Sequence, residues 1–452
     1  MATNTIAHPL RETRGAPKGH VLWGHLPAAA RDRLGFFTAA SAYGDIVPLR
    51  FGPFRYVLAS HPDLVEQVLV TDHKSFKKSR EVRMPRLTLG NGLLTSEGEF
   101  WLRQRRLAQP AFHRAQVAGY ADTMVEAAER AAAAWPDGAT LDIHAEMMKL
   151  TLDIAGRTLF GADVSTEAAE VGDALDVILA GFDKQFDSRL PLPDSVPTPR
   201  QRRVRRAVRR LDALVYRMIA ERRAATDDRN DLLSLLLRAR DEDGSRMTDE
   251  QLRDEVMTIL LASHETAAIT LTWLWSLIAR DAHVEAKLAE ELERVLGGRP
   301  PTVADVPELR YTDMVVHEVL RVYPPAWFFP RMATREVDLA GYRVRRGTSV
   351  ILSPWVVHRD PRWFTDPDRF QPERWADGLA DRLPKYAYFP FGGGARLCIG
   401  APFAMLELVL ATAALAQRYR FELASDQIVA PRATFTLRPA GEVPMTLHRR
   451  TR

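Results

Sequence analysis

One long apolar helix constrains the fold of this chain more than any other feature. The sequence from Thr248 to Arg280 predicts a helix of about 32 residues, which would span roughly 48 Å. Thr248 and Gln251 match a capping box at its start, and the acidic residues between them complement the helix dipole. Because the helix is apolar nearly all round, it is expected to be buried. The sequence therefore predicts a large, mostly helical molecule with one helix crossing its interior.

The rest of the chain predicts further helices and a small β-rich part. The stretch from Pro62 to about Ala279 is mainly helical, and a second long helix is expected near Pro402–Tyr419. Strand patterns between turn residues occur at Ile46–Phe51, Phe54–Ala59, Tyr342–Val344, Ser349–Leu352, Thr434–Leu437 and Met445–His448. No repeat, low-complexity tract or linker divides the sequence. We expect residues 1–452 to form a single domain that is mainly α with a small β part (α+β).

The distribution of apolar residues predicts a soluble, cytoplasmic protein without a membrane span. The most apolar stretch runs from Val256 to Ala279, and His264 and Glu265 interrupt it. The uninterrupted runs are shorter than the roughly 18 residues that a membrane-spanning helix needs. The first residues of the chain contain basic residues and prolines instead of the apolar segment of a signal peptide.

The chain has a formal net charge of +4, and much of the excess lies between Arg200 and Arg210. Such a basic run can bind nucleic acid or a membrane surface. The apolar residues of the same stretch, however, fall together on one side of a helix: Val204, Ala207, Val208 and Leu211. The arginines therefore predict a solvated helix face, and no zinc-finger spacing or RNA-binding aromatic motif supports a nucleic-acid partner.

Cys398 is the only cysteine in the sequence. A single cysteine excludes an intramolecular disulfide and excludes zinc or iron–sulfur sites built from several thiolates. The remaining roles are an inert core thiol, a nucleophile and a lone metal ligand. The residues around Cys398 bear on the choice between them.

Cys398 lies in the glycine-rich stretch Phe391-Gly-Gly-Gly-Ala-Arg-Leu-Cys-Ile-Gly400. Glycines let the backbone approach a bulky, flat group and adopt positive φ angles. Pro402 suits the first turn of a following helix, whose dipole and free N–H groups would stabilise a thiolate. Arg396 adds a cation that can hold a carboxylate or a phosphate. The stretch lacks the Gly-Lys-Ser/Thr ending of a phosphate loop and any signature of a base for a cysteine nucleophile.

The pattern Phe391-x-x-Gly394-x-Arg396-x-Cys398-x-Gly400 resembles the heme-binding signature of the cytochrome P-450 family. Other blocks resemble that family in the same order along the chain: Trp101-x-x-x-Arg105, Ala262-Ser-His-Glu-Thr266, Glu318-Val-Leu-Arg321 followed by Tyr323-Pro-Pro325, and Phe370-Gln-Pro-Glu-Arg-Trp375. The resemblance covers nearly the whole chain from about Gly15. It implies the cytochrome P-450 fold, with one large helical domain around a buried heme b (iron protoporphyrin IX).

The resemblance implies roles for residues beside the heme. Cys398 would be the thiolate ligand of the iron, in a loop framed by Phe391 and Gly400. Two buried heme propionates carry about two negative charges and need several cations. Their expected partners are Trp101, Arg105, Arg331 and Arg396.

A second group resembles the family's structural ion triad near the thiolate loop. Its members are Glu318, Arg321 and Arg374. Glu318 and Arg321 are one helical turn apart, so they can pair on one face. The implied role is assembly, and loss of Glu318 predicts an unstable, heme-poor protein.

Glu265 and Thr266 resemble the acid–alcohol pair that delivers protons during oxygen activation. The alternative is that both residues only pack within the helix. Two neighbours depart from the usual family pattern, with Ser263 where glycine is common and Ala267 where a second threonine often follows. Ser263 adds a hydroxyl that affects the position of water in this part of the helix.

The family pattern places the substrate pocket beside the middle of the long helix. The candidate lining residues are Ile259, Ala262, Trp327, Phe328 and Phe435. The bulk of Trp327, Phe328 and Phe329 favours a restricted, apolar cavity, although an aromatic cluster is more often plain core. The Pro-rich segment Phe182–Pro199 is expected to form a lid.

The predicted activity is the insertion of one oxygen atom of O₂ into an apolar small molecule such as a terpenoid, a fatty acid or a polyketide-like compound. Because the sequence shows no flavin or ferredoxin domain, we expect an external ferredoxin or flavodoxin with an NAD(P)H-dependent reductase. An acidic donor would dock on basic residues near Arg103 and Arg106, and a monomer is expected. The alternatives are a peroxide-driven or isomerase-type heme enzyme of the same fold, and a non-catalytic heme sensor or gas carrier.

Overall fold

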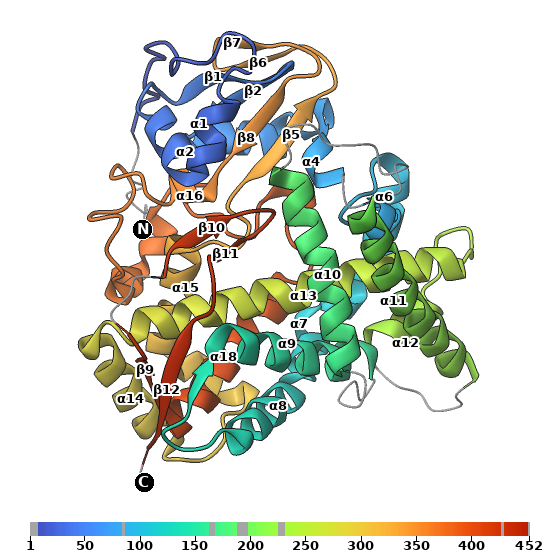
Figure 1. Ribbon diagram of the computed structural model, residues 1–452, viewed down its shortest axis with the longest axis vertical. Helices are drawn as coiled ribbons and strands as arrows, with labels where there is room; N and C mark the ends of the chain where they lie inside the picture. Colours follow the sequence, from blue (N-terminus) through green and yellow to red (C-terminus); the bar gives the residue numbers. More distant parts are fainter. Residues whose placement is uncertain are drawn as a thin grey trace.

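The helix predicted from Thr248 is the central element of the structure. The computed structural model describes residues 8–83, 86–161, 168–187, 198–224, 231–425 and 429–450. In it α13 (Asp249–Ile278) has 30 residues and crosses the molecule (Figure 1). The Thr248 side chain accepts from the Gln251 N–H and the Gln251 side chain accepts from the Thr248 N–H, so the predicted capping box is confirmed.

Most other helices surround α13, and α9 (Ile143–Phe160) packs along it. The second predicted long helix is α18 (Ala401–Arg418), with a proline in its first turn. The remaining described α-helices are α1 (Leu26–Arg31), α2 (Arg33–Ser41), α3 (Pro62–Glu66), α4 (Arg80–Arg83), α5 (Arg86–Leu89), α6 (Gly98–Ala108), α7 (Arg114–Ala118), α8 (Ala121–Ala134), α10 (Ala168–Asp187), α11 (Pro199–Ala224), α12 (Leu232–Arg238), α14 (Ala282–Leu296), α15 (Arg310–Val322), α16 (Pro354–Val357) and α17 (Leu379–Arg382).

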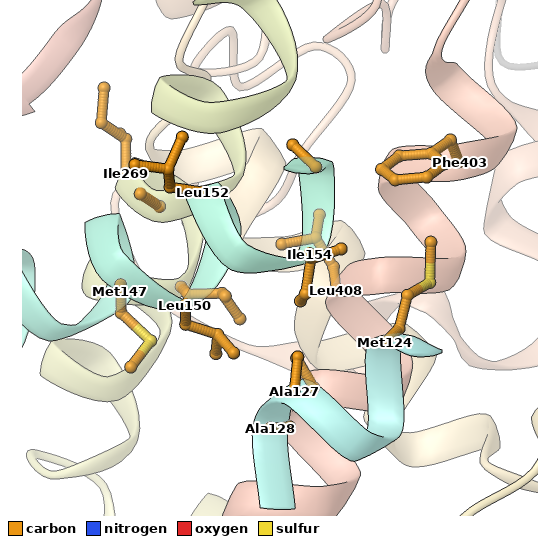
Figure 2. Close-up of a cluster of buried hydrophobic side chains, with 14 of the residues drawn as sticks. Met124, Ala127, Ala128, Met147, Leu150, Leu152, Ile154, Ile269, Phe403 and Leu408 are labelled. Atoms are coloured by element: carbon orange, nitrogen blue, oxygen red, sulfur yellow. The ribbon is translucent and has the colours of Figure 1, made fainter. Parts of the chain in front are cut away.

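The helices bury one large apolar core. Figure 2 shows the part of it where α8, α9, α13 and α18 meet. Met124 of α8, Ile154 of α9 and Leu408 of α18 lie within this cluster, and each is at most 1% exposed. At about 25 cal/mol per Å² of apolar surface, such burial is the main source of stability for this half of the molecule.

The β-rich part is divided, with its largest sheet at the top of Figure 1 and a smaller sheet near the bottom. Its main sheet has the strand order β1-β2-β8-β5-β3, from β1 (Ile46–Phe51), β2 (Phe54–Ala59), β8 (Ser349–Leu352), β5 (Phe329–Ala333) and β3 (Phe76–Lys78). A three-stranded sheet contains β4 (Thr140–Asp142), β12 (Pro444–Arg449) and β9 (Tyr419–Leu423). Two hairpins complete the described strands, β6 (Val337–Leu339) with β7 (Tyr342–Val344) and β10 (Pro431–Ala433) with β11 (Leu437–Pro439).

One strand prediction is wrong. The sequence predicts a strand at Thr434–Leu437, but the structure has two short strands with a turn between them at residues 434–436. The turn closes through the Thr434 N–H, which donates to the Thr436 carbonyl at 2.9 Å. β-Branched residues favour strands, but here the local hydrogen bonds of threonine stabilise a turn instead. The position of this turn is important because Thr436 within it contacts α13.

The basic run between Arg200 and Arg210 lies in α11, as a solvated helix face. Arg202, Arg203 and Arg209 are exposed, whereas Ala207 and Leu211 on the other side are buried. The interpretation made from helical spacing is therefore confirmed. The predicted lid, Phe182–Pro199, includes residues 188–197, which lie outside the described residues.

Among the described residues, no helix combines the length and the apolar character needed to cross a membrane.

Candidate functional site

The Cys398 loop runs between a short 3₁₀ turn (Gly394–Arg396) and the start of α18. Its glycines are needed for close packing. A Cβ atom at Gly394 would lie 2.0 Å from the Leu69 carbonyl oxygen, and one at Gly393 would lie 2.3 Å from the Tyr386 ring. Gly394 also has a φ of +62°, in the left-handed region that favours glycine. The glycine-rich stretch therefore presses its backbone against neighbouring segments and fixes the position of Cys398.

The surroundings of the Cys398 thiol act on its pKa in opposite directions. The side chain has exposed surface, yet burial among protein atoms raises the pKa of the thiol. The N–H groups of Gly400 and Ala401 and the charge of Arg105 lower it. The helix-terminus effect expected from the sequence is present, but it is outweighed by burial, so the pKa is raised overall. A cation bound at the sulfur would reverse this balance, because it stabilises the thiolate directly.

Trp101 and Arg105 hold this loop from α6. Their side chains lie one turn apart on the helix, so both reach the same neighbour. Arg396 lies over the Trp101 ring, with its guanidinium carbon 3.6 Å from the ring centroid. Arg105 donates from Nη1 to the Leu397 carbonyl oxygen at 2.9 Å. The Trp-x-x-x-Arg block therefore contacts the residues immediately before Cys398.

A group of buried cations lies beside the loop, and it includes one residue that the sequence did not single out. Lys78 on β3 stands opposite Arg331 on β5, and the charges of Arg331 and Arg396 both act on it. Burial, together with the neighbouring cations, lowers the pKa of Lys78 to about 6 and that of Arg331 to about 10. Lys78 Nζ donates to the carbonyl oxygens of Leu93 and Ser96, at 2.6 and 2.9 Å.

Two carboxyl groups act on these cations. Glu97 pairs with Arg396 and accepts the Lys78 N–H at 2.6 Å. Glu255 of α13 accepts the Leu93 N–H at 3.0 Å, and burial raises its pKa to about 8, which leaves it largely neutral at pH 7. Lys78 is also largely neutral at pH 7, so the charged groups that remain are two cations, Arg331 and Arg396, and one anion, Glu97. Such a set fits a ligand that brings carboxylates of its own.

Glu318, Arg321 and Arg374 are brought together as predicted. Arg321 makes two bonds to the Glu318 carboxylate, at 2.8 and 2.9 Å, and Arg374 makes one at 2.8 Å. The structure adds two partners that the sequence did not suggest, the Trp375 indole N–H at 2.9 Å and the Gln371 N–H at 3.0 Å. The Glu318 side chain is fully buried, so its charge is balanced entirely by these donors.

The middle of α13 has one open face. Ala262 is exposed and Thr266 is half-buried, although most of the helix is buried. These two residues lie one turn apart, and the Thr266 hydroxyl donates to the Ala262 carbonyl oxygen at 2.8 Å. Ser263 lies on the same side and donates to the Leu260 carbonyl oxygen at 3.3 Å. The described residues therefore leave this side of the helix partly uncovered, whereas His264 and Glu265 are buried.

Glu265 points elsewhere. Its carboxylate is 6% exposed and accepts the Thr436 hydroxyl at 2.9 Å, and it forms an ion pair with Arg438 of β11. Successive residues on an α-helix point about 100° apart, which explains why Glu265 faces the β10–β11 hairpin while Thr266 lies on the open face. The pairing of Glu265 with Thr266 as a proton relay stays a prediction.

The predicted pocket residues differ in their surroundings. Trp327 is 1% exposed and packs on Phe37 and Phe328. Its indole N–H donates to the Thr434 carbonyl oxygen at 2.9 Å. Trp327 is therefore a core residue and not a pocket wall. Ile259 is also nearly buried within the core. Phe328 is half-buried, as is Phe435, whose ring contacts Phe182 of α10.

The basic residues proposed for donor docking are paired within the chain. Arg103 donates to Asp241 at 2.7 Å and to the Ser245 hydroxyl at 2.8 Å. Arg106 donates to Glu242 at 2.7 Å. Because the acidic turn neutralises both arginines, they do not form the basic docking face that the sequence predicts.

Comparison with known proteins identifies the family. A family model described as cytochrome P-450 matches residues 15–442. The chain belongs to the cytochrome P-450 family, whose members bind heme b with a thiolate ligand.

Individual relatives agree with this assignment. The chain is 42% identical to cyclooctatin synthase of Streptomyces melanosporofaciens, over 93% of each chain. It is 38% identical to pentalenene oxygenase of Streptomyces avermitilis, over 96% of this chain and 97% of the relative. The structure of retinoic acid-bound cyanobacterial CYP120A1 has the same fold, with a TM-score of 0.86, 24% identity and coverage of 98% of this chain and 100% of that chain. The protein is a cytochrome P-450 monooxygenase that binds heme b.

Proposed function

We propose that this protein oxidises a cyclic terpenoid, and that Cys398 would supply the thiolate ligand of the heme iron. The observation that carries the proposal is the Cys398 loop itself, a glycine-fixed thiol at the start of α18 beside an excess of buried cations. When bound, a thiolate-ligated heme supplies the activation of O₂ and the transfer of one oxygen atom to the substrate.

The residues beside the loop have distinct roles in this proposal. Arg331, Arg396 and Lys78 would hold the two heme propionates, whose negative charges would offset the local positive charge. Arg105 stays close to the sulfur, where its charge lowers the pKa of the thiol. Trp101 keeps Arg396 in place through the stacking contact between them.

Thr266 and Glu265 are the residues proposed to transfer protons. Thr266 presents its hydroxyl on the open face of α13, where it can donate to a group held there and then be reprotonated. Glu265 would act as the acid of the pair from the hairpin side of the helix, where it accepts the Thr436 hydroxyl. The helix thus carries an alcohol on one face and an acid about a quarter-turn away.

The relatives support the substrate class. Two Streptomyces proteins that are similar over nearly the whole chain are named for cyclooctatin and pentalenene, which are cyclic terpenoids. A third is named cyclooctat-9-en-7-ol 5-monooxygenase and is 39% identical. Half-buried Phe328 and Phe435 provide apolar surface of the kind that such a substrate requires.

We further propose that electrons come from a ferredoxin or flavodoxin with an NAD(P)H-dependent reductase. The docking site does not involve Arg103 and Arg106, because Asp241 and Glu242 already pair with them.

The first experiment is the optical spectrum of the reduced, CO-bound protein. The wild type is expected to show the strongly red-shifted Soret band of a thiolate-ligated heme, and Cys398→His is expected to show an imidazole-type band instead. A wild-type protein without heme, or with the imidazole-type band, would contradict the assignment of Cys398.

Substrate binding is then measured as a shift in heme spin state. Pentalenene and a long-chain fatty acid of similar carbon number are titrated separately into the oxidised protein. A shift with pentalenene alone supports the terpenoid class, and a shift with the fatty acid alone contradicts it. Turnover with hydrogen peroxide but not with NADPH and a ferredoxin system would favour the peroxide-driven alternative.

A further inference from the structure

The segment 90–96, between α5 and α6, lies against the first turns of α13. Two consecutive acidic residues of α13 bind its backbone. Asp254 accepts the Asn91 N–H at 2.7 Å, and Glu255 accepts the Leu93 N–H at 3.0 Å. Asp254 is 8% exposed and Glu255 is 1% exposed, so both acceptors are largely shielded from water. Two buried carboxyl groups therefore tie this segment to the central helix.

Two glycines let the segment come this close to α13. A Cβ atom at Gly90, where φ is +58°, would lie 1.9 Å from the Asp254 carboxylate, and one at Gly92 would lie 2.2 Å from the Thr258 hydroxyl. Both distances are far shorter than a van der Waals contact, so a side chain at either position would overlap the helix. The Thr95 hydroxyl donates to the Gly90 carbonyl oxygen at 2.7 Å and holds the segment in this shape. The close approach therefore depends on the backbone of these two glycines.

The same segment also contacts the basic side chains of the heme site. Lys78 Nζ donates to the carbonyl oxygens of Leu93 and Ser96, at 2.6 and 2.9 Å. Arg396 donates from Nη1 to the Ser96 carbonyl oxygen at 3.5 Å. The Leu93 residue thus binds α13 through its N–H and Lys78 through its carbonyl oxygen. The segment lies between the central helix and the side chains that would hold the propionates.

Asp254 is itself fixed by a second contact. Arg253 donates to the Asp254 carboxylate at 2.9 Å and to Asp212 of α11 at 2.6 Å, and it is 7% exposed. The Asp254 carboxylate therefore keeps a buried cationic partner when the Asn91 N–H moves away from it. Movement of the segment does not leave this charge buried alone, which would be costly.

We propose that segment 90–96 is a flap that opens to let heme enter and leave, and that Asp254 and Glu255 are positioning residues that hold the flap closed. The closed flap keeps Lys78 and Arg396 in place to receive the propionates. The inference rests on the proposed function, because it concerns how the same heme is retained. A contact that closes a flap slows both entry and release, whereas a contact that only binds the cofactor acts mainly on release.

The first test is the rate of heme loss to excess apomyoglobin. Asp254→Ala and Gly90→Ala are each expected to lose heme several-fold faster than the wild type, because the first removes the acceptor of the Asn91 N–H and the second pushes the flap off Asp254. Gly138→Ala is the matched control, since Gly138 has a φ of +71° and no atom within 4 Å of its Cβ position. Loss rates of both flap variants that equal that of the control would overturn the proposal.

The double variant separates this contact from general destabilisation. In the Asp254→Ala background the overlap is relieved, so Gly90→Ala should add no more than the effect of backbone strain that Gly138→Ala measures. Effects of the two substitutions that multiply in full would show that Gly90 and Asp254 act independently, and would overturn their pairing.

Conservative variants test the hydrogen bonds. Burial raises the pKa of Glu255 to about 8, so the group is largely neutral at pH 7 and Glu255→Gln resembles it. Glu255→Gln keeps an acceptor for the Leu93 N–H and is expected to retain heme nearly as long as the wild type, whereas Glu255→Ala is expected to lose it faster. Equally fast loss from both variants would overturn the role of this bond.

The rate of entry distinguishes a flap from a binding contact. Holoprotein is mixed with serum albumin, and the fraction that keeps the thiolate CO spectrum at equilibrium is measured. Entry follows from this fraction and the rate of loss. In Asp254→Ala both rates should rise, so the fraction should change less than the loss rate does. In Lys78→Met the fraction should fall by the same factor as the loss rate rises. The Lys78→Met behaviour in Asp254→Ala would overturn the flap.

Hydrogen exchange reports the flap directly in the holoprotein. Peptides that cover residues 90–96 should exchange faster in Asp254→Ala than in the wild type, while peptides from the second half of α13 keep their protection. Equal loss of protection in α13 would overturn the proposal, because faster heme loss would then reflect general unfolding.

The outcomes separate this inference from the proposed function. A normal thiolate spectrum in the wild type, with unchanged heme loss and unchanged exchange in Asp254→Ala, would overturn the flap alone. Absence of the thiolate spectrum in the wild type would overturn the proposed function itself.

Discussion

At the scale of single residues, Lys78 is the clearest example of a buried charged group that contributes to the site. It lies at the end of β3, opposite Arg331, and its ammonium group is buried under the loop that carries Leu93 and Ser96. A buried lysine is costly unless it is paired with an anion. The position therefore makes sense as part of a carboxylate-binding group and not as an isolated charge.

Lys78→Met should weaken heme retention while leaving the fold intact. The methionine fills similar volume but removes one cation from the proposed propionate site, and loss of such a supporting group commonly costs about tenfold or more in affinity. The rate of heme loss to excess apomyoglobin measures the effect. Lys77→Met, at the neighbouring and less buried position of the same strand, is the control. Equal rates for the two variants would show that Lys78 does not bind the propionates.

At this scale the sequence predicted some contacts and missed others. Cys398, Trp101 and Arg105 come from motifs with fixed spacing, and the structure places them together. Lys78 and Arg438 acquire their roles only through strand pairing and long-range packing, so nothing in their local sequence marks them. Trp327 was misjudged because an aromatic cluster has the same composition whether it lines a pocket or fills the core.

Among the elements, α15 shows how a helix is fixed to a stretch that includes a 3₁₀ helix at Pro372–Gly378. Glu318 and Arg321 project from the same face of α15 and bind residues of the stretch that follows Pro367. Glu318 alone accepts bonds from Arg374 and Trp375 of that stretch. The predicted triad is thus the centre of a larger network that attaches this stretch to α15.

Glu318→Gln is expected to destabilise the protein by about 3–5 kcal/mol, because it leaves Arg321 and Arg374 buried without their counter-charge. The free energy of unfolding in urea measures the loss, and the purified variant should contain less heme. Glu336→Gln is the control, since it breaks an exposed pair with Arg343 worth about 0–1 kcal/mol. A loss for Glu318→Gln no larger than that of the control would refute the structural role.

Helix boundaries were predicted more reliably than short strands. The capping box at Thr248 and the proline at the start of α18 are local signals, and both mark the observed helix starts. The turn at residues 434–436 carries β-branched residues, and its geometry depends on contacts with α13 and Trp327. The strand preference of these β-branched residues therefore predicted a strand where the structure has a turn.

On the scale of the whole molecule, an ion-pair cluster ties the N-terminal segment to the β-rich part. Asp45 is fully buried at its side chain and accepts from Arg11 and Arg362, and Arg362 also binds Asp360. Burial raises the pKa of Asp45, but the bonds from Arg362 and Arg11 outweigh it and lower the pKa overall. Residues more than 300 positions apart are thereby connected.

The stability that the Asp45 carboxylate contributes should be lost in acid. A carboxyl whose pKa is lowered on folding contributes stability above its unfolded value of about 3.9, and that stability is lost as the pH falls through the lower folded value. Asp45→Asn is expected to cost about 3 kcal/mol at pH 7, and the difference from the wild type should shrink below about pH 4. Urea unfolding at both pH values tests this, with exposed Asp368→Asn as the control. A difference that does not depend on pH would exclude a charge effect.

The contacts between α13 and the β10–β11 hairpin also determine when the site is completed during synthesis. Glu265 and Thr436 are separated by 171 positions, and Trp273 and the Leu437 carbonyl that it binds by 164. At about 5–20 residues per second, a ribosome needs roughly 10–30 s to add the intervening chain. During that time the central helix has emerged, but the groups that bind its buried carboxylate have not been made. A nascent chain therefore carries Glu265 without Thr436 and Arg438 until the hairpin itself has been translated.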